Sequence, residues 1–238
     1  MLLSVCAGGG FLCAPASGSR SSGISVELFN PDARRRIPLR IYHPGSRRAL
    51  AVVLPGVGAQ LGDYSFLARY LARRGFAVAE VQLELPGDPP IATSGNIAAL
   101  RASELHSGVN TLQYTITQLA HLGYASATQP PVLVGHSNGG DVAMLYGSEY
   151  RGQIGMIFSL DNLRVPILRA RKPHVCSLRS NDQEPDEALV PNDQQRRRFN
   201  IQIQRTNIPH GQMWNGATTA QRRFILTALG QCLDHRPM

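Results

Sequence analysis

The feature that most constrains the fold is a short apolar run that leads through a glycine-flanked serine into a helix-like segment. Val132-Leu-Val134 follows two prolines and is apolar throughout, as in a strand inside a sheet. The next residues, Gly135-His-Ser-Asn-Gly139, form a G-x-S-x-G pattern. A sharp strand-to-helix turn would expose the hydroxyl of Ser137 at the strand's end, and backbone crowding would require glycine at both flanking positions. An ordinary glycine-rich turn is the alternative interpretation.

Expected strands and helices alternate along the rest of the chain. The expected strands are 24–29, 37–42, 49–54, 76–81, 132–134, 154–160, 174–178 and 200–204, and the expected helices are 64–74, 105–119, 141–146 and 218–233. This alternation predicts an α/β fold with a doubly wound, mostly parallel sheet, helices on both faces and the first two strands as an antiparallel edge hairpin. The Pro- and Gly-rich segment from Glu84 to about Ser103 is expected to be a loop.

The N-terminal segment favours export without establishing it. Residues 1–23 are expected to lie outside the fold as a leader or signal peptide, with 24–238 forming one domain. Ala14-Pro-Ala16 is an A-x-A pattern typical of signal-peptide cleavage before Ser17. Against export, the segment has no positively charged start and is interrupted by Gly8-Gly-Gly10. The two hypotheses are a periplasmic or secreted protein, which we favour, and a cytoplasmic one with a disordered leader.

The charge of the chain is strongly positive, and almost all of it comes from arginine. The formal net charge is +8, and Lys172 is the only lysine. The arginines fall in small groups spread along the chain, with no aromatic-interleaved basic block or nucleic-acid motif, so we expect a solvated basic surface and no nucleic-acid partner. No apolar run is long enough to span a membrane.

The cysteines predict neither a disulfide framework nor a metal site. Without the leader, two cysteines remain, Cys176 in an expected strand and Cys232 in an expected helix. We interpret them as two buried thiols. No spacing typical of metal ligands occurs, so no metal and no other cofactor is expected.

Ser137, Asp182 and His210 each follow an expected strand, and their order along the chain resembles that of the α/β-hydrolase superfamily. The chain looks like one of its small, lidless bacterial members. Because the carboxyl ends of parallel strands share one rim, the three side chains are expected to meet there. The resemblance implies the α/β-hydrolase fold and a carboxylesterase-like serine hydrolase, acting on an ester, thioester or similar acyl substrate through an acyl-enzyme and without a cofactor.

Each member of this set has an expected role. A serine hydroxyl needs a base to become a nucleophile, so Ser137 is expected to be the nucleophile and His210 the base. Of the seven histidines, His210 alone lies on a loop after the last expected strand. Asp182 is the expected acid, because it ends the penultimate strand and would orient the imidazole. The alternatives for the acid are Asp161, Glu184 and Asp186.

Two backbone N–H groups are expected to form an oxyanion hole, those of Val57 and Asn138. Further candidates for substrate contact come from the neighbouring loops: Gly56, Gly58, Glu84, Asp88, Arg101, Arg164, Met213 and Trp214. The two arginines would either hold an anionic substrate group or pair with residues that support the site, and the second role is favoured. The methionine and tryptophan would form an apolar wall beside His210.

Access to this site is expected to depend on the Glu84–Ser103 loop, because the segment between Asp161 and His174 is too short for a large helical lid. The alternative function is a catalytically silent scaffold used for binding, and a peptidase or an acyltransferase would use the same three residues. The sequence indicates neither the acyl group of the substrate nor the oligomeric state.

Overall fold

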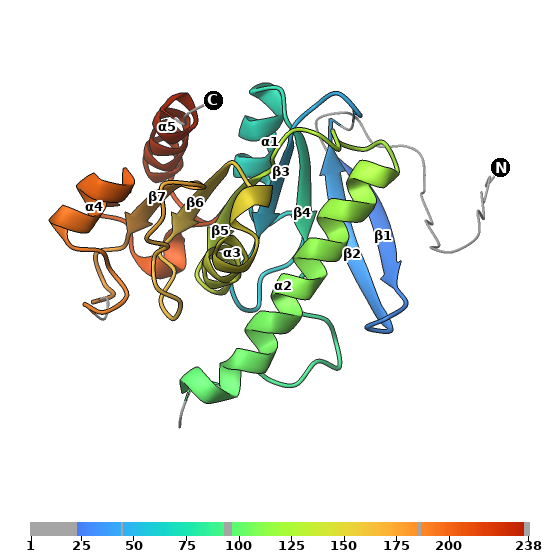
Figure 1. Cartoon of the computed structure of the whole chain (residues 1–238), viewed down its shortest axis with the longest axis horizontal. Helices are drawn as coiled ribbons and strands as arrows, with labels where there is room; N and C mark the ends of the chain where they lie inside the picture. The colour runs from blue at the N-terminus through green and yellow to red at the C-terminus, as the bar shows by residue number, and fades with distance from the viewer. Residues whose placement is uncertain (1–22, 44, 93–96, 185–186, 236–238) are drawn as a thin grey trace.

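The structure is a computed structural model of the 238-residue chain, and it describes residues 23–43, 45–92, 97–184 and 187–235. The cleavage pattern before Ser17 and the alternative acid Asp186 lie outside the described residues. The described strands form one eight-stranded sheet, and helices pack on both of its faces (Figure 1).

The sheet is parallel except at one edge. Its strands are β1 (Ile24–Asn30), β2 (Arg35–Tyr42), β3 (Leu50–Leu54), β4 (Ala77–Val81), β5 (Val132–His136), β6 (Met156–Leu160), β7 (His174–Arg179) and β8 (Gln202–Arg205). They lie in the order β1-β2-β4-β3-β5-β6-β7-β8. The β1–β2 and β2–β4 pairs are antiparallel and the other pairs are parallel. The predicted doubly wound sheet with an antiparallel edge hairpin is therefore confirmed.

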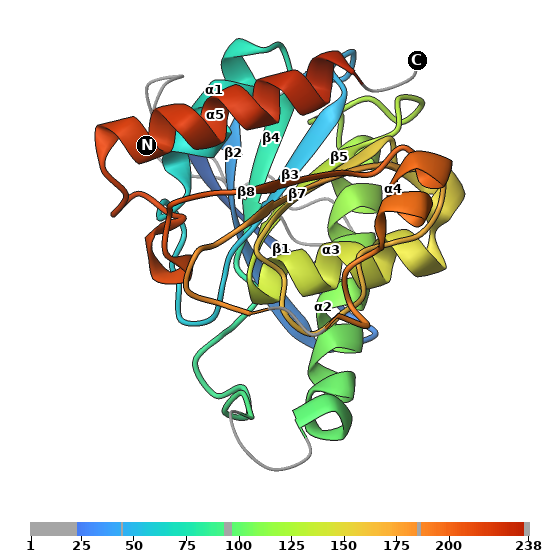
Figure 2. The same cartoon turned by 90° about the vertical axis from the view of Figure 1, so that its left-hand side faces the viewer.

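Two layers of helices cover this sheet. The helices are α1 (Ser65–Arg73), α2 (Ile97–His121), α3 (Asn138–Glu149), α4 (Asp193–Phe199) and α5 (Thr219–Asp234), with single 3-10 turns at Arg151–Gln153 and His210–Gln212. Figure 2 shows α1 and α5 on one face and α2 and α3 on the other. Of the described helices, none is both long and apolar enough to cross a membrane.

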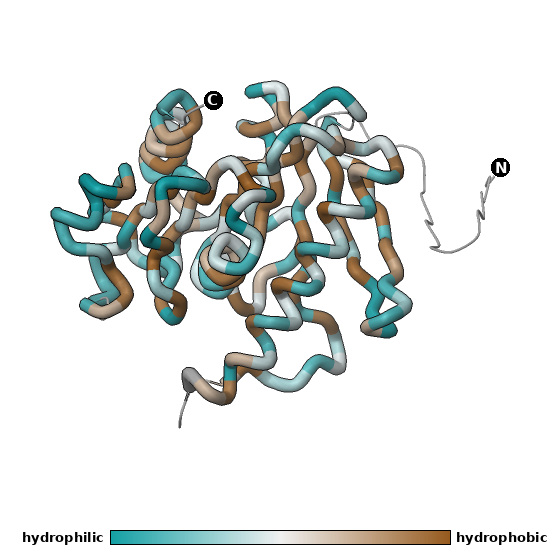
Figure 3. The backbone as a smooth tube through the Cα atoms, viewed as in Figure 1, coloured by the Kyte–Doolittle hydropathy of each residue, from teal (hydrophilic) through white to brown (hydrophobic). Residues whose placement is uncertain are grey.

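The sheet has an apolar core on each face because successive strand residues point in opposite directions. In β3, Leu50 and Val52 join the core beneath α2 and α3, whereas Ala51 and Val53 join the core beneath α1 and α5. A strand buried on both faces must be largely apolar, as β3 is along its whole length and β5 is over residues 132–134. Figure 3 shows the contrasting edge hairpin, where hydrophobic and hydrophilic residues alternate along β1 and β2.

Two local predictions need correction. The predicted loop from Glu84 to Ser103 is too long, because α2 already begins at Ile97, in a stretch of good helix formers that follows the last glycine. The helix α4 was not predicted. It begins with a capping box, in which the Asn192 side chain accepts from Gln195 N–H and the Gln195 side chain accepts from Asn192 N–H.

The prediction of two free buried thiols is wrong, because Cys176 and Cys232 form a disulfide with their Cα atoms 6.3 Å apart. The two residues lie in the predicted kinds of element, on β7 and α5. The helix packs across β6 and β7, which brings Cys232 over the strand residue that faces it. This pairing depends on helix placement, which spacing along the chain does not reveal.

Candidate active site

The site begins at the turn between β5 and α3, where Ser137 has the positive φ of 50° that a sharp turn imposes. The glycines on either side have no room for a side chain. A Cβ on Gly135 would lie 2.3 Å from the carbonyl oxygen of Gly139, and one on Gly139 would lie 2.3 Å from that of Leu54. The strand–turn–helix prediction is confirmed, and the two glycines are needed for the reason that the sequence suggested.

The three groups of the site form a continuous hydrogen-bonded line. The Nε2 atom of His210 lies 3.0 Å from Ser137 Oγ, and its Nδ1 atom lies 2.7 Å from Asp161 Oδ2. An imidazole that carries its proton on Nδ1 donates to the carboxylate and leaves Nε2 free to accept the serine proton. A hydroxyl, an imidazole and a carboxylate thus lie in one hydrogen-bonded series.

The carboxylate in this line belongs to Asp161, whereas the sequence led us to expect Asp182 there. The sheet order places β6 directly beside β5, so the residue after β6 is one strand away from Ser137. Asp182 lies beyond the end of β7, is exposed, and accepts a hydrogen bond at 2.7 Å from the backbone N–H of His210. Both aspartates thus contact His210, but only Asp161 contacts its imidazole.

Asp161 is fully buried, and its surroundings keep it ionised. Ser180 N–H donates to its Oδ1 at 3.1 Å, and the buried guanidinium of Arg179 lies 3.3 Å from the same atom. Burial raises the pKa of the Asp161 carboxyl, but the hydrogen bonds from His210 and Ser180 and the positive charge of Arg179 outweigh it, so the pKa lies below its usual value. The imidazole of His210 therefore faces a negatively charged carboxylate.

Arg179 was missed by the sequence reasoning. The available signal was its position directly after the expected strand 174–178, because an arginine that is buried there needs a paired charge. Its second anchor is the carbonyl oxygen of Asn162, to which it donates at 2.7 Å.

A second histidine, His136, contacts the backbone carbonyl of His210. The Nε2 atom of His136 lies 3.1 Å from the His210 carbonyl oxygen, and its Nδ1 atom lies 2.6 Å from Tyr64 Oη. Burial lowers the pKa of His136 to about 4, so the ring is neutral near pH 7. A neutral ring accepts from the tyrosine hydroxyl on one nitrogen and donates to the carbonyl on the other.

The backbone around Ser137 offers two unused donors. In the loop after β3, Gly56 N–H donates to Tyr64 Oη at 3.3 Å and Gly58 N–H donates to Glu84 Oε2 at 3.1 Å. No group in the described part of the chain accepts from the N–H of Val57, which lies between them, or from that of Asn138. The two predicted oxyanion donors are thus available, and Asn138 adds the positive end of α3.

The side chain of Asn138 is fixed by two residues of α2. Arg101 donates to Asn138 Oδ1 at 2.6 Å, and Asn138 Nδ2 donates to Glu104 Oε1 at 2.9 Å. Arg101 is buried and is also paired with Glu104 at 3.2 Å. Of the two roles predicted for Arg101, the structure shows the pairing with neighbouring residues, because its Nε and Nη2 atoms donate to Glu104 and Asn138. Arg164, its predicted companion, is exposed.

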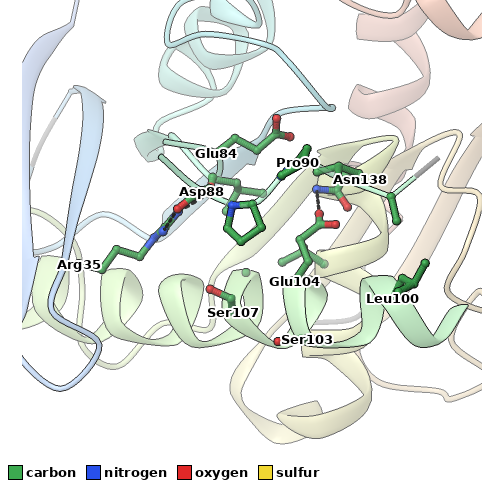
Figure 4. Close-up of a pocket in the computed structure, with 15 residues that line it drawn as sticks. Arg35, Glu84, Asp88, Pro90, Leu100, Ser103, Glu104, Ser107 and Asn138 are labelled. Atoms are coloured by element: carbon green, nitrogen blue, oxygen red, sulfur yellow. Dashed lines mark hydrogen bonds and ion pairs between the residues drawn. The ribbon is translucent and has the colours of Figure 1, made fainter. Parts of the chain in front are cut away.

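A pocket of about 430 Å³ lies beside Asn138, between the segment after β4 and the start of α2 (Figure 4). Glu84 and Asp88, both predicted to contact substrate, line it. Met213 and Trp214 do not. Met213 is fully buried in the core beneath α1 and α5, and Trp214 is 39% exposed with its indole N–H bonded to Gly211 O. The predicted apolar wall beside His210 is therefore wrong for Met213.

The described residues bring together one group of possible metal ligands, His174, Cys176 and Cys232. The two sulfur atoms are joined in the disulfide, so they are not thiolate ligands.

Comparison with known proteins identifies the fold but no near relative. No protein-family model matches the sequence, and no curated protein matches it. Among solved structures, a ferulic acid esterase from Streptomyces cinnamoneus is 16% identical with a TM-score of 0.60, covering 87% of this chain and 84% of its own. An S-formylglutathione hydrolase from Agrobacterium tumefaciens is 10% identical with a TM-score of 0.64, covering 94% and 99%.

A third similar structure carries the name of the fold. The alpha/beta hydrolase domain-containing protein 10 from mouse is 10% identical with a TM-score of 0.53, covering 84% of this chain and 94% of its own. Identities this low carry over the architecture, and the sheet order and the turn at Ser137 agree with it. The chain has the α/β-hydrolase fold.

Proposed function

We propose that this protein is a serine hydrolase that cleaves an ester, thioester or similar acyl compound. The observation that carries the proposal is the hydrogen-bonded line from Asp161 through His210 to Ser137, at 2.7 Å and 3.0 Å. Ser137 is the nucleophile, His210 the general base and Asp161 the acid that orients the imidazole. The names of similar structures, an esterase and an S-formylglutathione hydrolase among them, support an acyl substrate.

In the proposed acylation step, His210 acts first as a base and then as an acid. Ser137 Oγ attacks the acyl carbon while its proton passes to Nε2 of His210, and the carbonyl π-electron pair moves onto the oxygen. The N–H groups of Val57 and Asn138 stabilise that oxyanion. The carbonyl then re-forms, the bond to the alcohol or thiol breaks, and the leaving group takes the proton from Nε2.

Deacylation repeats the sequence with water as the nucleophile. His210 accepts a proton from water, the hydroxyl adds to the acyl carbon, and the bond to Ser137 Oγ breaks as Nε2 returns the proton to the serine. The carboxylic acid product leaves and the enzyme regains its starting protonation.

The test is the Ser137→Ala variant, assayed with p-nitrophenyl esters of graded chain length. Removal of the nucleophile should lower kcat by about 10⁵- to 10⁶-fold. A fluorophosphonate probe should label the natural protein and not the variant. Near-normal turnover by Ser137→Ala would exclude the serine-hydrolase mechanism.

A catalytically silent scaffold predicts a different result, in which the natural protein neither hydrolyses the esters nor reacts with the probe. Aminoacyl amides and added acceptor alcohols in the same assay distinguish a peptidase or an acyltransferase from an esterase.

We also propose that the protein functions outside the cytoplasm. The Cys176–Cys232 disulfide supports this, because such bonds persist in oxidising compartments. N-terminal sequencing of protein from the native host tests the proposal: a start at Ser17 is expected, and an intact Met1 on a protein of the cytoplasmic fraction would contradict it.

A further inference from the structure

The pocket beside Asn138 is placed to receive the acyl part of a substrate. It borders the residue that follows Ser137, and none of its lining residues comes from the loop that carries His210. The leaving group must lie beside Nε2 of His210 to take its proton, so we expect the acyl chain to extend to the other side of the scissile bond, toward Asn138 and the pocket. The apolar part of the pocket lining consists of Leu83, Pro89, Pro90, Ile91, Ala92, Leu100 and Val142.

The charges around this pocket do not cancel. Arg35 donates two hydrogen bonds of 2.7 Å to the two carboxylate oxygens of Asp88, so this pair is neutral. Arg101 and Glu104 form a second neutral pair at 3.2 Å. The Glu84 carboxylate has no cationic partner within the described residues, and its one hydrogen-bond donor there is the backbone N–H of Gly58. One negative charge is left without a counterion.

The position of Glu84 makes this charge effective. The side chain is half-buried at the pocket wall, where the dielectric is lower than in water. Burial raises the pKa of Glu84, and the negative charge of Glu104 raises it further against the opposing effects of Gly58 N–H and Arg101. Because the ionised carboxylate of Glu84 lies at the pocket wall without a cationic partner among the residues that the structure describes, a group that enters the pocket experiences a negative potential, which stabilises a cation and repels an anion.

We propose that this pocket selects substrates whose acyl group carries a positive charge over isosteric neutral ones and over anionic ones, with Glu84 as the specificity-determining residue. The proposal rests on the serine-hydrolase function proposed above. It departs from one of the two roles predicted for Arg101, that of holding an anionic substrate group, because Arg101 is bound to Glu104 and Asn138.

Three p-nitrophenyl esters of similar length test the proposal. The 4-(trimethylammonio)butanoate ester and the 5,5-dimethylhexanoate ester have the same shape and differ by one positive charge, and the glutarate monoester carries a carboxylate. The kcat/KM of each is measured above its rate in buffer. The natural protein should prefer the cationic ester over its neutral isostere by about tenfold, and should hydrolyse the anionic one most slowly.

Glu84→Gln should bring the ratio of cationic to neutral kcat/KM close to one. The amide oxygen of glutamine still accepts from Gly58 N–H, so the variant removes the charge and keeps the contact. Glu187→Gln is the matched control, because Glu187 is exposed and does not line the pocket, and its ratio should equal that of the natural protein. A natural ratio of one or less, or a ratio that Glu84→Gln does not change, would overturn the proposal.

Failure of the proposed function is distinguishable from failure of this inference. If none of the three esters is hydrolysed, the function fails, and calorimetric binding of the cationic and neutral esters to Ser137→Ala still reports the charge preference. If all three are hydrolysed without charge preference, the function stands and the inference is wrong.

Discussion

The turns after β6 and β7 each bring an aspartate to His210, and the two aspartates differ in burial and in the part of His210 that they contact. Asp161 is fully buried, has a positive φ of 53°, and meets the imidazole. Asp182 is exposed and meets only the backbone N–H of the same histidine. Arg179 and Ser180 hold the carboxylate of Asp161 in place, whereas that of Asp182 is exposed to solvent.

The difference shows that closeness to a histidine does not define a catalytic acid. A carboxylate orients an imidazole when it is buried, charged and aimed at a ring nitrogen, and each of these properties comes from neighbours. A carboxylate at the surface can at most fix the path of the loop. The variants below separate these two roles, from the largest expected effect to the smallest.

Asp161→Asn should have the largest effect, a loss in kcat of about 10⁴-fold. The amide keeps the shape of the side chain, but it favours an imidazole that carries its proton on Nε2 and cannot accept from Ser137. Steady-state hydrolysis of the best p-nitrophenyl ester measures the loss. Asp182→Asn in the same assay is the control. A larger loss of kcat in that variant would mean that Asp182, in the turn after β7, is the acid.

Arg179→Met should lower the free energy of unfolding by about 3 to 5 kcal/mol, because it leaves Asp161 buried without its cationic partner. It should also raise the pKa of Asp161, which Arg179 helps to lower, so activity at acid pH should be lost at a higher pH than in the natural protein.

Denaturant unfolding and a pH–kcat profile measure these two effects of Arg179→Met. Arg205→Met is the control, because Arg205 is exposed on the neighbouring strand and faces Arg179 in the register. Equal stability of the two variants would show that burial of the Asp161 charge needs no arginine.

Part of the site could be predicted from sequence because its restraints leave a recognisable pattern of residues. The glycines at 135 and 139 are required by backbone within the turn and by the end of β3, and the sequence pattern carries that requirement. His210 is recognisable by its loop after the last strand. The acid cannot be recognised in this way, because Asp161 and Asp182 both follow strands. Which of them reaches the imidazole depends on where each strand ends relative to Ser137 and on the conformation of the turn.

Other features depend on contacts between distant elements. The bond between Cys176 and Cys232 requires the placement of α5 over β7, and the engagement of Arg101 requires α2 to pack beside α3. The capping box at Asn192 was present in the sequence, three residues before Gln195, and a search for such pairs would have found α4.

His136→Gln should flatten the acid side of the stability profile. The pKa of His136 is about 4 in the folded protein and about 6.5 in an unfolded chain, so between these values the unfolded state binds more protons. Stability should therefore fall as the pH drops from about 6.5 to 4, by about 3 kcal/mol from this residue.

The difference in unfolding free energy between the natural protein and His136→Gln, measured at several pH values, isolates this contribution from that of the carboxyl groups. His121→Gln, a change at an exposed histidine of α2, should leave the slope as it is. A slope shared by all three proteins would show that the ring is not held neutral.

Asp182→Ala should have the smallest effect, about a fivefold loss of kcat. The variant removes the acceptor for His210 N–H, which lies at an exposed position where water replaces it, so the loop loosens without losing the contact between the imidazole and Asp161. Asp182→Asn should be close to the natural protein, because its side-chain oxygen still accepts that hydrogen bond. Higher activity in Asp182→Asn than in Asp182→Ala would show that Asp182 acts by accepting the hydrogen bond from the backbone N–H of His210. If Asp182→Asn lost as much activity as Asp182→Ala, the charge of Asp182 would be needed. The two aspartates would then differ in how deeply they are buried, and both would act on His210 through their charge.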